Sequence, residues 1–395
     1  MKILEINKFY HPWLGGVEKV VQDIAEGLNG QNELTVSVLA CQTRNKRKIE
    51  EINGIKIYRA GTIGKLFGMP LSIDFFRLLK SIRSDYDAIL IHHPFPLAFL
   101  ARSLGRDQKL FIWYHSDIIR QKLSKWLFLP FIKAGLKRAD RILVGSQKLA
   151  DSSPLLQKHE TKCEVINFGV DLDYFTADTN IKQAAIKIKQ TNDQPLILSV
   201  GRLVPYKGFK YLISALAENI PIKDGLAARI QAKLIIIGAG PEEKRLTALI
   251  KKLNLEDQVT IIKPVPDLRP FYEACDLFVL PSISANEAFG LVQIEAMAYG
   301  KPIINTSLAT GVNEVSPHNV SGLSVPPRNP RALAQAIARI LSDPELKNSL
   351  GSNARSRVVD IFNQKNFIKK LTKLLSIRLS NVLKPLEKSD HERNR

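Results

Sequence analysis

Short apolar segments alternate with amphipathic helical patterns along the whole 395-residue chain. Residues Val17, Val20, Val21, Ile24 and Leu28, for example, repeat at helical spacing. Each of these segments has apolar residues on both faces and is therefore predicted to be a buried parallel strand. These strands are residues 2–6, 34–40, 88–92, 110–114, 141–144, 196–200, 233–237, 259–262, 277–280 and 302–305. Strand–helix alternation implies right-handed crossovers, so each half is predicted to be a doubly wound α/β domain.

A polar stretch at residues 176–193 interrupts this alternation before a fresh strand begins. We therefore predict a first domain at residues 1–178, a second at 193–362, and a basic helix and tail at 363–395. Ligands of open α/β sheets bind beyond the carboxyl ends of the strands. Two such domains facing each other would thus form a binding cleft between them.

Several features predict a cytoplasmic protein. No uncharged apolar run approaches the roughly 18 residues that a membrane span requires, and Glu5 stands where a signal peptide would be apolar. The cysteines Cys41, Cys163 and Cys275 form no disulfide framework and no metal-binding spacing, which favours a reducing compartment.

The chain has 57 basic and 38 acidic residues, a net charge of +19. Such a surface attracts polyanions: nucleic acid, anionic lipid or phosphorylated substrates. No nucleic-acid-binding motif accompanies the charge, so nucleic acid is not expected as a partner. Residues 120–133 and 365–384 mix cations with apolar side chains, in the manner of a membrane-surface helix. The alternative is that both are ordinary helices whose apolar faces pack inward.

Two glutamates, Glu287 and Glu295, flank the start of a predicted helix in the second half. This helix follows the strand at 277–280, and is predicted to begin near Phe289 and to end at Gly300. Glutamate is usually a solvated helix residue. Here the neighbouring side chains are mostly apolar, so both acids are expected to need polar partners.

The start of this helix suits a nucleoside diphosphate. The free N–H groups of Phe289, Gly290 and Leu291 would point at an anion, and Gly290 would permit close approach. Glu295 lies on the order of 7 Å further along the helix axis, comparable to the distance from a phosphate to its ribose. We therefore predict phosphates at the helix start, ribose hydroxyls on Glu295 and sugar hydroxyls on Glu287.

The sequence E-A-F-G-L-V-Q-I-E-A-M-A-Y-G-K-P at 287–302 closely resembles the signature of glycosyltransferase family 4. Members are retaining enzymes of the GT-B fold, with two Rossmann-like domains facing across a deep cleft. The resemblance extends over roughly residues 1–362. It implies sugar transfer from a nucleotide-sugar donor, with no metal and no other cofactor.

The resemblance implies donor-binding roles for further residues. Residues 200–208, V-G-R-L-V-P-Y-K-G, are similar to the family loop whose arginine and lysine hold the diphosphate, here Arg202 and Lys207. Val265 occupies the base-binding position, although the lead-in at 262–264 departs from the family's aromatic-Leu-Gly.

In the first half, Gly16 belongs to a paired-glycine turn before a helix, which is weak evidence of phosphate binding by itself. It is similar to the family loop that approaches the donor phosphates. His115 follows a predicted strand and should project into the cleft, where a histidine of the family approaches the transferred sugar. A satisfied structural histidine is the alternative. The D-x-D sequence at 171–173 mimics a metal site, but its surroundings match a family segment at the domain junction, and no metal is predicted.

Residues 115–122 look similar to bacterial O-antigen and exopolysaccharide mannosyltransferases. We therefore predict GDP-mannose as donor, with a UDP-sugar as the alternative. The predicted acceptor is a growing cell-surface glycan on a lipid carrier, reached through peripheral contact with an anionic membrane. Rival functions are a nucleotide-sugar epimerase or sugar-phosphate synthase on the same fold, and a non-catalytic polyanion-binding protein. Glu287 is either a covalent nucleophile or a positioning group, and positioning is preferred.

Overall fold

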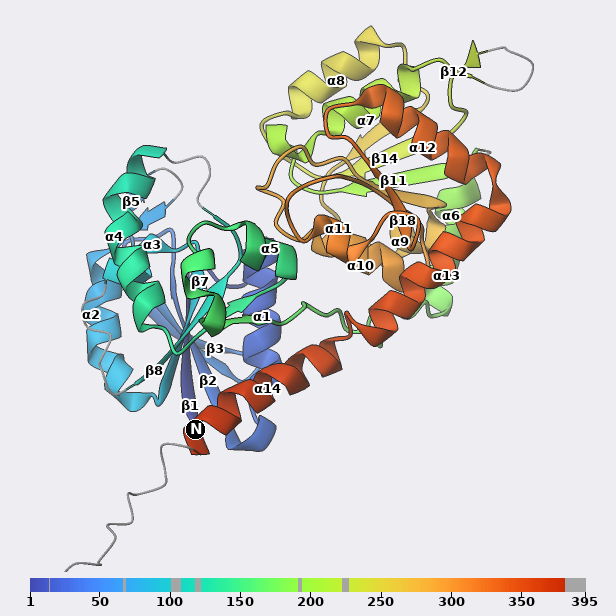
Figure 1. The fold of residues 1–395 in the computed structure, drawn as a ribbon. Helices are drawn as coiled ribbons and strands as arrows, with labels where there is room; N and C mark the ends of the chain where they lie inside the picture. Colours follow the sequence, from blue (N-terminus) through green and yellow to red (C-terminus); the bar gives the residue numbers. More distant parts are fainter. Residues whose placement is uncertain are drawn as a thin grey trace, which may run out of the picture.

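The computed structural model describes residues 1–13, 15–66, 69–100, 108–117, 122–190, 194–221 and 227–380. Within them the chain forms two separate, mainly parallel sheets, each flanked by helices (Figure 1). The predicted α/β class is confirmed, and each strand expected from the sequence is present to within a residue or two at its ends.

The first sheet has the strand order β10-β9-β8-β7-β1-β2-β4-β3. The strands are β1 (Lys2–Asn7), β2 (Thr35–Cys41), β3 (Lys48–Ile52), β4 (Ile55–Ala60), β7 (Ala88–His93), β8 (Lys109–Tyr114), β9 (Arg141–Val144) and β10 (Cys163–Val165). Its helices are α1 (Gly16–Leu28), α2 (Ile73–Ile82), α3 (Pro96–Leu100), α4 (Lys122–Arg138) and α5 (Gln147–Ser152), and a small hairpin adds β5 (Gly64–Leu66) and β6 (Met69–Leu71). The strand order reverses between β1 and β7, which are parallel neighbours.

The second sheet is parallel throughout, in the order β15-β14-β11-β16-β17-β18. Its strands are β11 (Leu196–Val200), β14 (Lys233–Ile237), β15 (Val259–Ile262), β16 (Leu277–Leu280), β17 (Ile303–Thr306) and β18 (Gly322–Val325). The helices are α6 (Thr179–Gln190), α7 (Phe209–Ala217), α8 (Glu243–Lys252), α9 (Arg269–Ala274), α10 (Leu291–Ala298), α11 (Val312–Val315), α12 (Pro330–Ser342) and α13 (Pro344–Asp360). A short antiparallel pair, β12 (Ile220–Pro221) and β13 (Ala227–Ala228), lies outside this sheet. Here the strand order reverses between β11 and β16.

Helix α6 lies within the polar stretch that was expected to interrupt the alternation. It packs against α9 of the second domain and buries Ile181 and Ala185. The sequence analysis did not predict this helix, because few positions of this largely polar segment face the protein interior: Ile181 and Ala185 are buried, and Ile188 is partly buried against the core. Residues 179–190 of the predicted boundary stretch therefore form a helix of the second domain.

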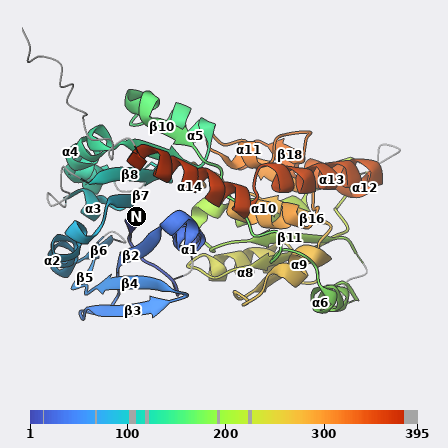
Figure 2. The same cartoon turned by 90° about the horizontal axis from the view of Figure 1, so that it is seen from below.

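The final helix, α14 (Gln364–Ser380), leaves the second domain and lies against α1 of the first (Figure 2). Ile368 contacts α1 at Gly27, and the Phe367 ring meets the Trp113 ring edge-on, with centroids 5.7 Å apart. Leu371 and Leu375 are also buried. From residue 365 to residue 376, the apolar face of the second basic segment therefore packs inward, which agrees with the alternative interpretation; residues 381–384 lie outside the described residues.

The other basic segment, residues 120–133, lies partly outside the described residues, and so do the side chains of 122–127. Further along α4, Ile132 and Leu136 are buried, and Gly135 packs against Phe99. None of the helices in the described ranges combines the length and apolar character needed to cross a bilayer.

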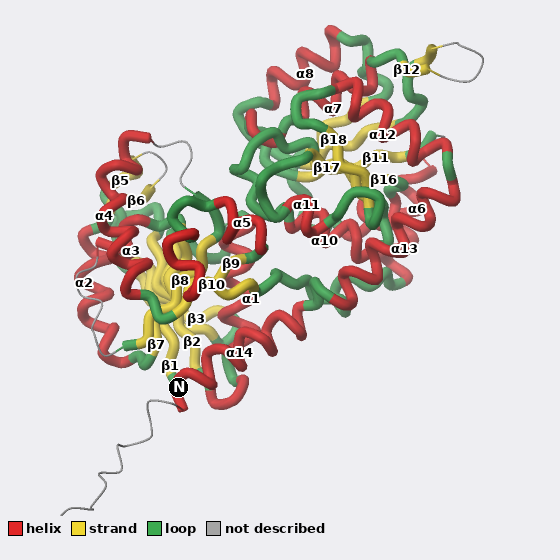
Figure 3. Tube along the Cα trace, viewed as in Figure 1, coloured by secondary structure: helices red, strands yellow, loops and turns green. Residues whose placement is uncertain are grey.

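The chain crosses between the domains in the loop after β10 and again at the junction of α13 and α14 (Figure 3). These crossings touch each other, because Val170 and Asn363 form a parallel bridge. Gly169 makes this approach possible, since a Cβ at that position would lie 2.5 Å from the carbonyl carbon of Asn363.

Candidate active site

The loops that follow β11 and β16 carry the predicted donor-binding residues of the second domain. Their strands are neighbours at the point where the strand order reverses, which is where open α/β sheets bind ligands. Arg202 and Lys207 follow β11, and Glu287 follows β16. The topology thus brings together residues that are about 80 positions apart in the sequence.

Lys207 and Glu287 form a largely buried ion pair. Lys207 Nζ lies 2.6 Å from Glu287 Oε2, and the two side chains are only 11% and 10% exposed. The hydroxyl of Ser282 donates to the same oxygen at 2.8 Å. The other oxygen, Oε1, accepts no hydrogen bond from the rest of the described chain. Glu287 is therefore held by one oxygen and has the other available to a ligand.

The backbone around Lys207 depends on glycine. Gly201 lies directly against the lysine side chain, since a Cβ there would sit 3.3 Å from Lys207 Nζ. Gly208, at φ +71°, approaches the carbonyl of Pro281 so closely that no side chain would fit. Arg202 is more open and contacts the hydroxyl of Tyr206 at 3.3 Å. Lys207 is thus fixed by packing, whereas Arg202 is exposed.

Helix α10 begins at Leu291, two residues later than predicted. The reason is the N-cap Gly290, whose φ of +75° and ψ of 58° are left-handed and cannot belong to a helical turn. The N–H groups of Phe289, Gly290 and Leu291 donate to no other described residue. These N–H groups are therefore available to donate to an anion. Their role in binding phosphate stays a prediction.

Gly16 of the first domain faces the same helix start. A Cβ at Gly16 would lie 3.9 Å from Leu291 Cδ1, so the glycine turn before α1 and the start of α10 are in contact across the domains. The structure therefore brings together the two predicted phosphate-binding backbones.

Glu295 sits inside α10 and accepts a hydrogen bond from the Tyr272 hydroxyl at 2.6 Å. The pKa of Glu295 is raised, because the effect of burial outweighs the lowering by the Tyr272 hydrogen bond and by the ammonium of Lys19. Lys19 and its ion-pair partner Asp23 belong to α1. The predicted ribose-binding acid therefore also faces a charged pair from the first domain.

Val265 is half-buried against the core of the second domain, and its role towards the nucleotide base stays a prediction. Nearby Lys263, in the lead-in that departs from the family pattern, is paired with both oxygens of Glu243 at 2.6 and 2.7 Å. It therefore has a partner on α8.

The D-x-D sequence has structural partners. Asp171 accepts from the N–H of Asp173 at 2.9 Å, and Asp173 pairs with Lys365 at 2.7 Å. No group of three or more histidine, cysteine, aspartate or glutamate side chains within the described ranges is arranged to hold a metal ion.

His115 stands at the end of β8 and is buried where the domains meet. Its ring stacks on Phe168 at 5.8 Å, and Phe168 in turn meets Phe289 edge-on at 5.0 Å. Burial, reinforced by His93, lowers the pKa of His115 to about 3. At neutral pH His115 is therefore a neutral hydrogen-bonding group. Its role towards the sugar stays a prediction.

Two residues that the sequence analysis missed lie behind His115. His92 Nδ1 is 2.8 Å from His115 Nε2, and His92 Nε2 is 2.6 Å from Glu5 Oε1. The signal was available in part, because Glu5 is an acid inside a segment predicted to be a fully buried strand. Such an acid requires a buried partner.

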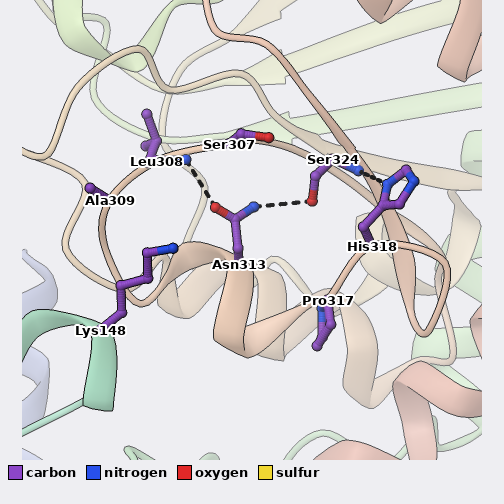
Figure 4. Close-up of a pocket in the computed structure, with 8 residues that line it drawn as sticks. All are labelled: Lys148, Ser307, Leu308, Ala309, Asn313, Pro317, His318 and Ser324. Atoms are coloured by element: carbon purple, nitrogen blue, oxygen red, sulfur yellow. Dashed lines mark hydrogen bonds between the residues drawn. The ribbon is translucent and has the colours of Figure 1, made fainter. Parts of the chain in front are cut away.

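A second contact between the domains lies beside the site. The carboxylate of Glu314 accepts the backbone N–H groups of Gln147 and Lys148, at the start of α5. Next to it is an open hollow of about 470 Å³ in which Asn313 bonds to Leu308 and Ser324 (Figure 4). Its lining comprises Lys148, Ser307, Leu308, Ala309, Asn313, Pro317, His318 and Ser324, none of which is a predicted site residue.

Comparison with known proteins agrees with this arrangement. Residues 14–174 match Glycosyltransferase Family 4, and residues 181–357 match the glycosyl transferases group 1. The chain is 27% identical to the O-antigen chain mannosyltransferase C of Escherichia coli, covering 93% of this chain and 96% of that one. It is 28% identical to the D-rhamnosyltransferase WbpZ of Pseudomonas aeruginosa, over 92% of each chain.

Among solved structures, the sucrose-phosphate synthase of Thermosynechococcus elongatus superposes with a TM-score of 0.79 at 25% identity. The match covers 96% of this chain and 99% of that one. The predicted fold, two Rossmann-like domains in the GT-B arrangement, is thereby confirmed over the 96% of the chain that this match covers.

Proposed function

We propose a function for this chain from the premise that it belongs to glycosyltransferase family 4 and has the GT-B fold. It transfers a hexosyl unit from a nucleotide sugar to a growing glycan, with retention at the anomeric carbon and without a metal ion. One observation carries the proposal: Lys207 and Glu287 converge, where the strand order reverses, with N–H groups at the start of α10 that donate to no described residue.

In this proposal the diphosphate lies between the start of α10 and the turn at Gly16. Arg202 and Lys207 offset the charge that develops on the leaving diphosphate. Glu295, already a partner of Tyr272, binds the ribose, and Val265 lies beside the base. Preorganised groups of this kind stabilise the transition state because they need not reorient during the reaction.

Glu287 and His115 hold the sugar, and Glu287 positions it without forming a covalent bond. Lys207 and Ser282 both bind Glu287 Oε2, which withdraws charge from that oxygen and fixes the carboxylate in place. Oε1 is then directed at a sugar hydroxyl. The acceptor attacks on the face that the diphosphate leaves, and the leaving phosphate takes the acceptor's proton.

We propose GDP-mannose as the donor, with a UDP-sugar as the alternative. The resemblance of residues 115–122 and the similarity to an O-antigen mannosyltransferase over 93% of the chain support this choice. A ligand at 100 times its dissociation constant stabilises a protein by about 2.7 kcal/mol. We therefore expect GDP-mannose to raise the melting temperature by several degrees, and by more than UDP-glucose at equal concentration, in a thermal-shift assay.

A larger shift with UDP-sugars would favour the alternative donor. No shift with any nucleotide sugar, together with tight, salt-sensitive binding to nucleic acid, would favour a polyanion-binding protein instead. Incubating the donor without acceptor and analysing the products separates transfer from epimerisation. An epimerised nucleotide sugar would contradict the proposed reaction.

The proposed acceptor is a glycan on a lipid carrier at the cytoplasmic face of a membrane, contacted peripherally. The net charge of +19 supports this, since each Lys or Arg near an anionic surface contributes about 1 kcal/mol. Because the apolar face of α14 is packed against the first domain, its contact with lipid would be electrostatic. The exposed cations of this helix include Lys369, Lys370 and Lys373.

We expect the protein to float with anionic vesicles at low salt and to be released at high salt. Replacing Lys369, Lys370 and Lys373 by glutamate should weaken this binding at least about tenfold. The control replaces Lys251 and Lys252, exposed cations on α8 of the other domain, by glutamate. Equal binding to neutral and anionic vesicles, or no binding to either, would contradict the membrane contact.

A further inference from the structure

We propose that Glu5 and His92 are positioning residues that hold the proton of His115 on Nδ1, so that His115 presents a neutral N–H donor to the transferred sugar. The inference rests on the proposed function only for the identity of the ligand. The hydrogen-bond chain itself lies entirely within the first domain.

The strand register of the first sheet places Glu5, His92 and His115 next to one another. Glu5 of β1 is opposite Leu90 of β7, and His92 lies two residues further along β7, on the same face. His92 is opposite Trp113 of β8, and His115 again lies two residues further along. The three side chains therefore form a diagonal row on one face of the sheet, which rises from its interior to its carboxyl edge.

The protonation state of Glu5 sets the direction in which the hydrogen bonds from Glu5 through His92 to His115 are donated. Glu5 and His92 have no exposed side-chain surface. Glu5 Oε2 has no hydrogen-bond partner among the described residues, and no lysine or arginine in that part of the chain pairs with the carboxyl. An ionised carboxylate with a bare buried oxygen would be very costly. Burial accordingly raises the pKa of Glu5 well above its ordinary value, and the group is a carboxylic acid.

A carboxylic acid donates its proton, and this fixes each tautomer in turn. The Glu5 hydroxyl at Oε1 donates to His92 Nε2 at 2.6 Å, so neutral His92 carries its proton on Nδ1. His92 Nδ1–H then donates to His115 Nε2 at 2.8 Å. Burial keeps the pKa of His92 and His115 low, so neither ring gains a second proton at neutral pH. The proton of His115 is left on Nδ1.

This arrangement suits a group that holds a sugar during transfer. His115 Nδ1 makes none of the hydrogen bonds found among the described residues, and as an N–H it would donate to a hydroxyl oxygen. Glycosyl transfer builds positive charge on the sugar ring in the transition state. A neutral donor orients the sugar without placing a cation beside that charge.

The test uses two substitutions of Glu5 in the full-length protein. In Glu5→Gln the side-chain amide can still donate to His92, so the direction of the chain is kept. In Glu5→Met a side chain of similar length donates nothing, and both histidines are free to exchange tautomers. We expect Glu5→Met to lower kcat about tenfold or more with little change in the KM of the donor. Glu5→Gln should retain activity to within about threefold.

The second readout does not depend on activity. Long-range ¹H–¹⁵N spectra of histidine-labelled protein distinguish the Nδ1–H tautomer from Nε2–H, and the chain has only seven histidines. The signals of His115 are assigned by their loss in His115→Gln. We expect the Nδ1–H form in the unaltered protein and in Glu5→Gln, and a mixture of forms in Glu5→Met.

An Nε2–H form of His115 in the unaltered protein would overturn the inference, even if no variant of Glu5 folds. Unchanged tautomers and kcat in Glu5→Met would overturn it as well. Because the tautomer is measured on the free protein, failure of this inference is distinguishable from failure of the proposed sugar transfer.

Discussion

Replacing Glu287 by glutamine is expected to lower the rate of sugar transfer about 100-fold or more while leaving the protein folded. Loss of one preorganised group that acts on the transition state typically costs two to three orders of magnitude in rate. The glutamine amide has the same size as the carboxylate and can still accept from Ser282. It carries no charge for Lys207, however, and with its single oxygen on Ser282 it presents an NH2 group where Glu287 Oε1 would accept from a sugar hydroxyl. The measurement is kcat at saturating donor, with the melting temperature as the check on folding.

The matched control is Glu256→Gln, an exposed glutamate of the same domain, for which kcat should not change. The Lys207→Met variant and the double variant complete a thermodynamic cycle. Breaking a buried pair costs more than removing both partners, so the double variant should be more stable than the sum of the single changes predicts. Retained transfer in Glu287→Gln would refute the site assignment, and additive stability effects would refute the importance of the ion pair.

The buried strands could be predicted from the sequence because both of their faces are apolar. Strands β3 and β4 were both missed, although β4 is buried at every position except Lys56. Strand β3 is of a different kind. β3 is mostly exposed and lies at the edge of the sheet, so its sequence K-I-E-E-I has no buried face to reveal it. The turn did carry a signal, since Asn53 and Gly54 both have positive φ and Asn-Gly is a strong hairpin sequence. The Asn53-Gly54 pair therefore indicates the hairpin of β3 and β4, which the apolar pattern alone does not reveal.

The site could be predicted wherever its residues belong to one local segment. The spacing of Glu287 and Glu295 is such a case, and so is the glycine at the helix start. Contacts between distant segments could not be predicted, because they depend on strand order and register. The ion pair between Lys207 and Glu287 is one example, and the partnership of Glu5 with His92 is another. The helix start was misplaced because spacing alone does not reveal a left-handed residue.

Gly290→Ala is expected to weaken donor binding about tenfold or more and to destabilise the second domain. A side chain at φ +75° costs roughly 1–2 kcal/mol. The new Cβ would also lie 2.7 Å from Leu280 Cδ2 and 2.8 Å from Gln293 Nε2, and both belong to the packed interior. Overpacking of this kind typically costs about 1–3 kcal/mol. The backbone must shift to relieve it, and the N–H groups of Phe289, Gly290 and Leu291 shift with it.

The same helix supplies a control at its other end. Gly300 also has a positive φ, +64°, but a Cβ there would meet nothing closer than the Gly351 carbonyl oxygen at 3.6 Å. Gly300→Ala should therefore cost only the conformational penalty and leave the dissociation constant of the donor, measured by calorimetry, unchanged. Equal donor affinity in Gly290→Ala and Gly300→Ala would contradict phosphate binding at the start of α10. Only a selective loss in Gly290→Ala ties the donor to those N–H groups, because the two variants place the same left-handed alanine just outside opposite ends of one helix.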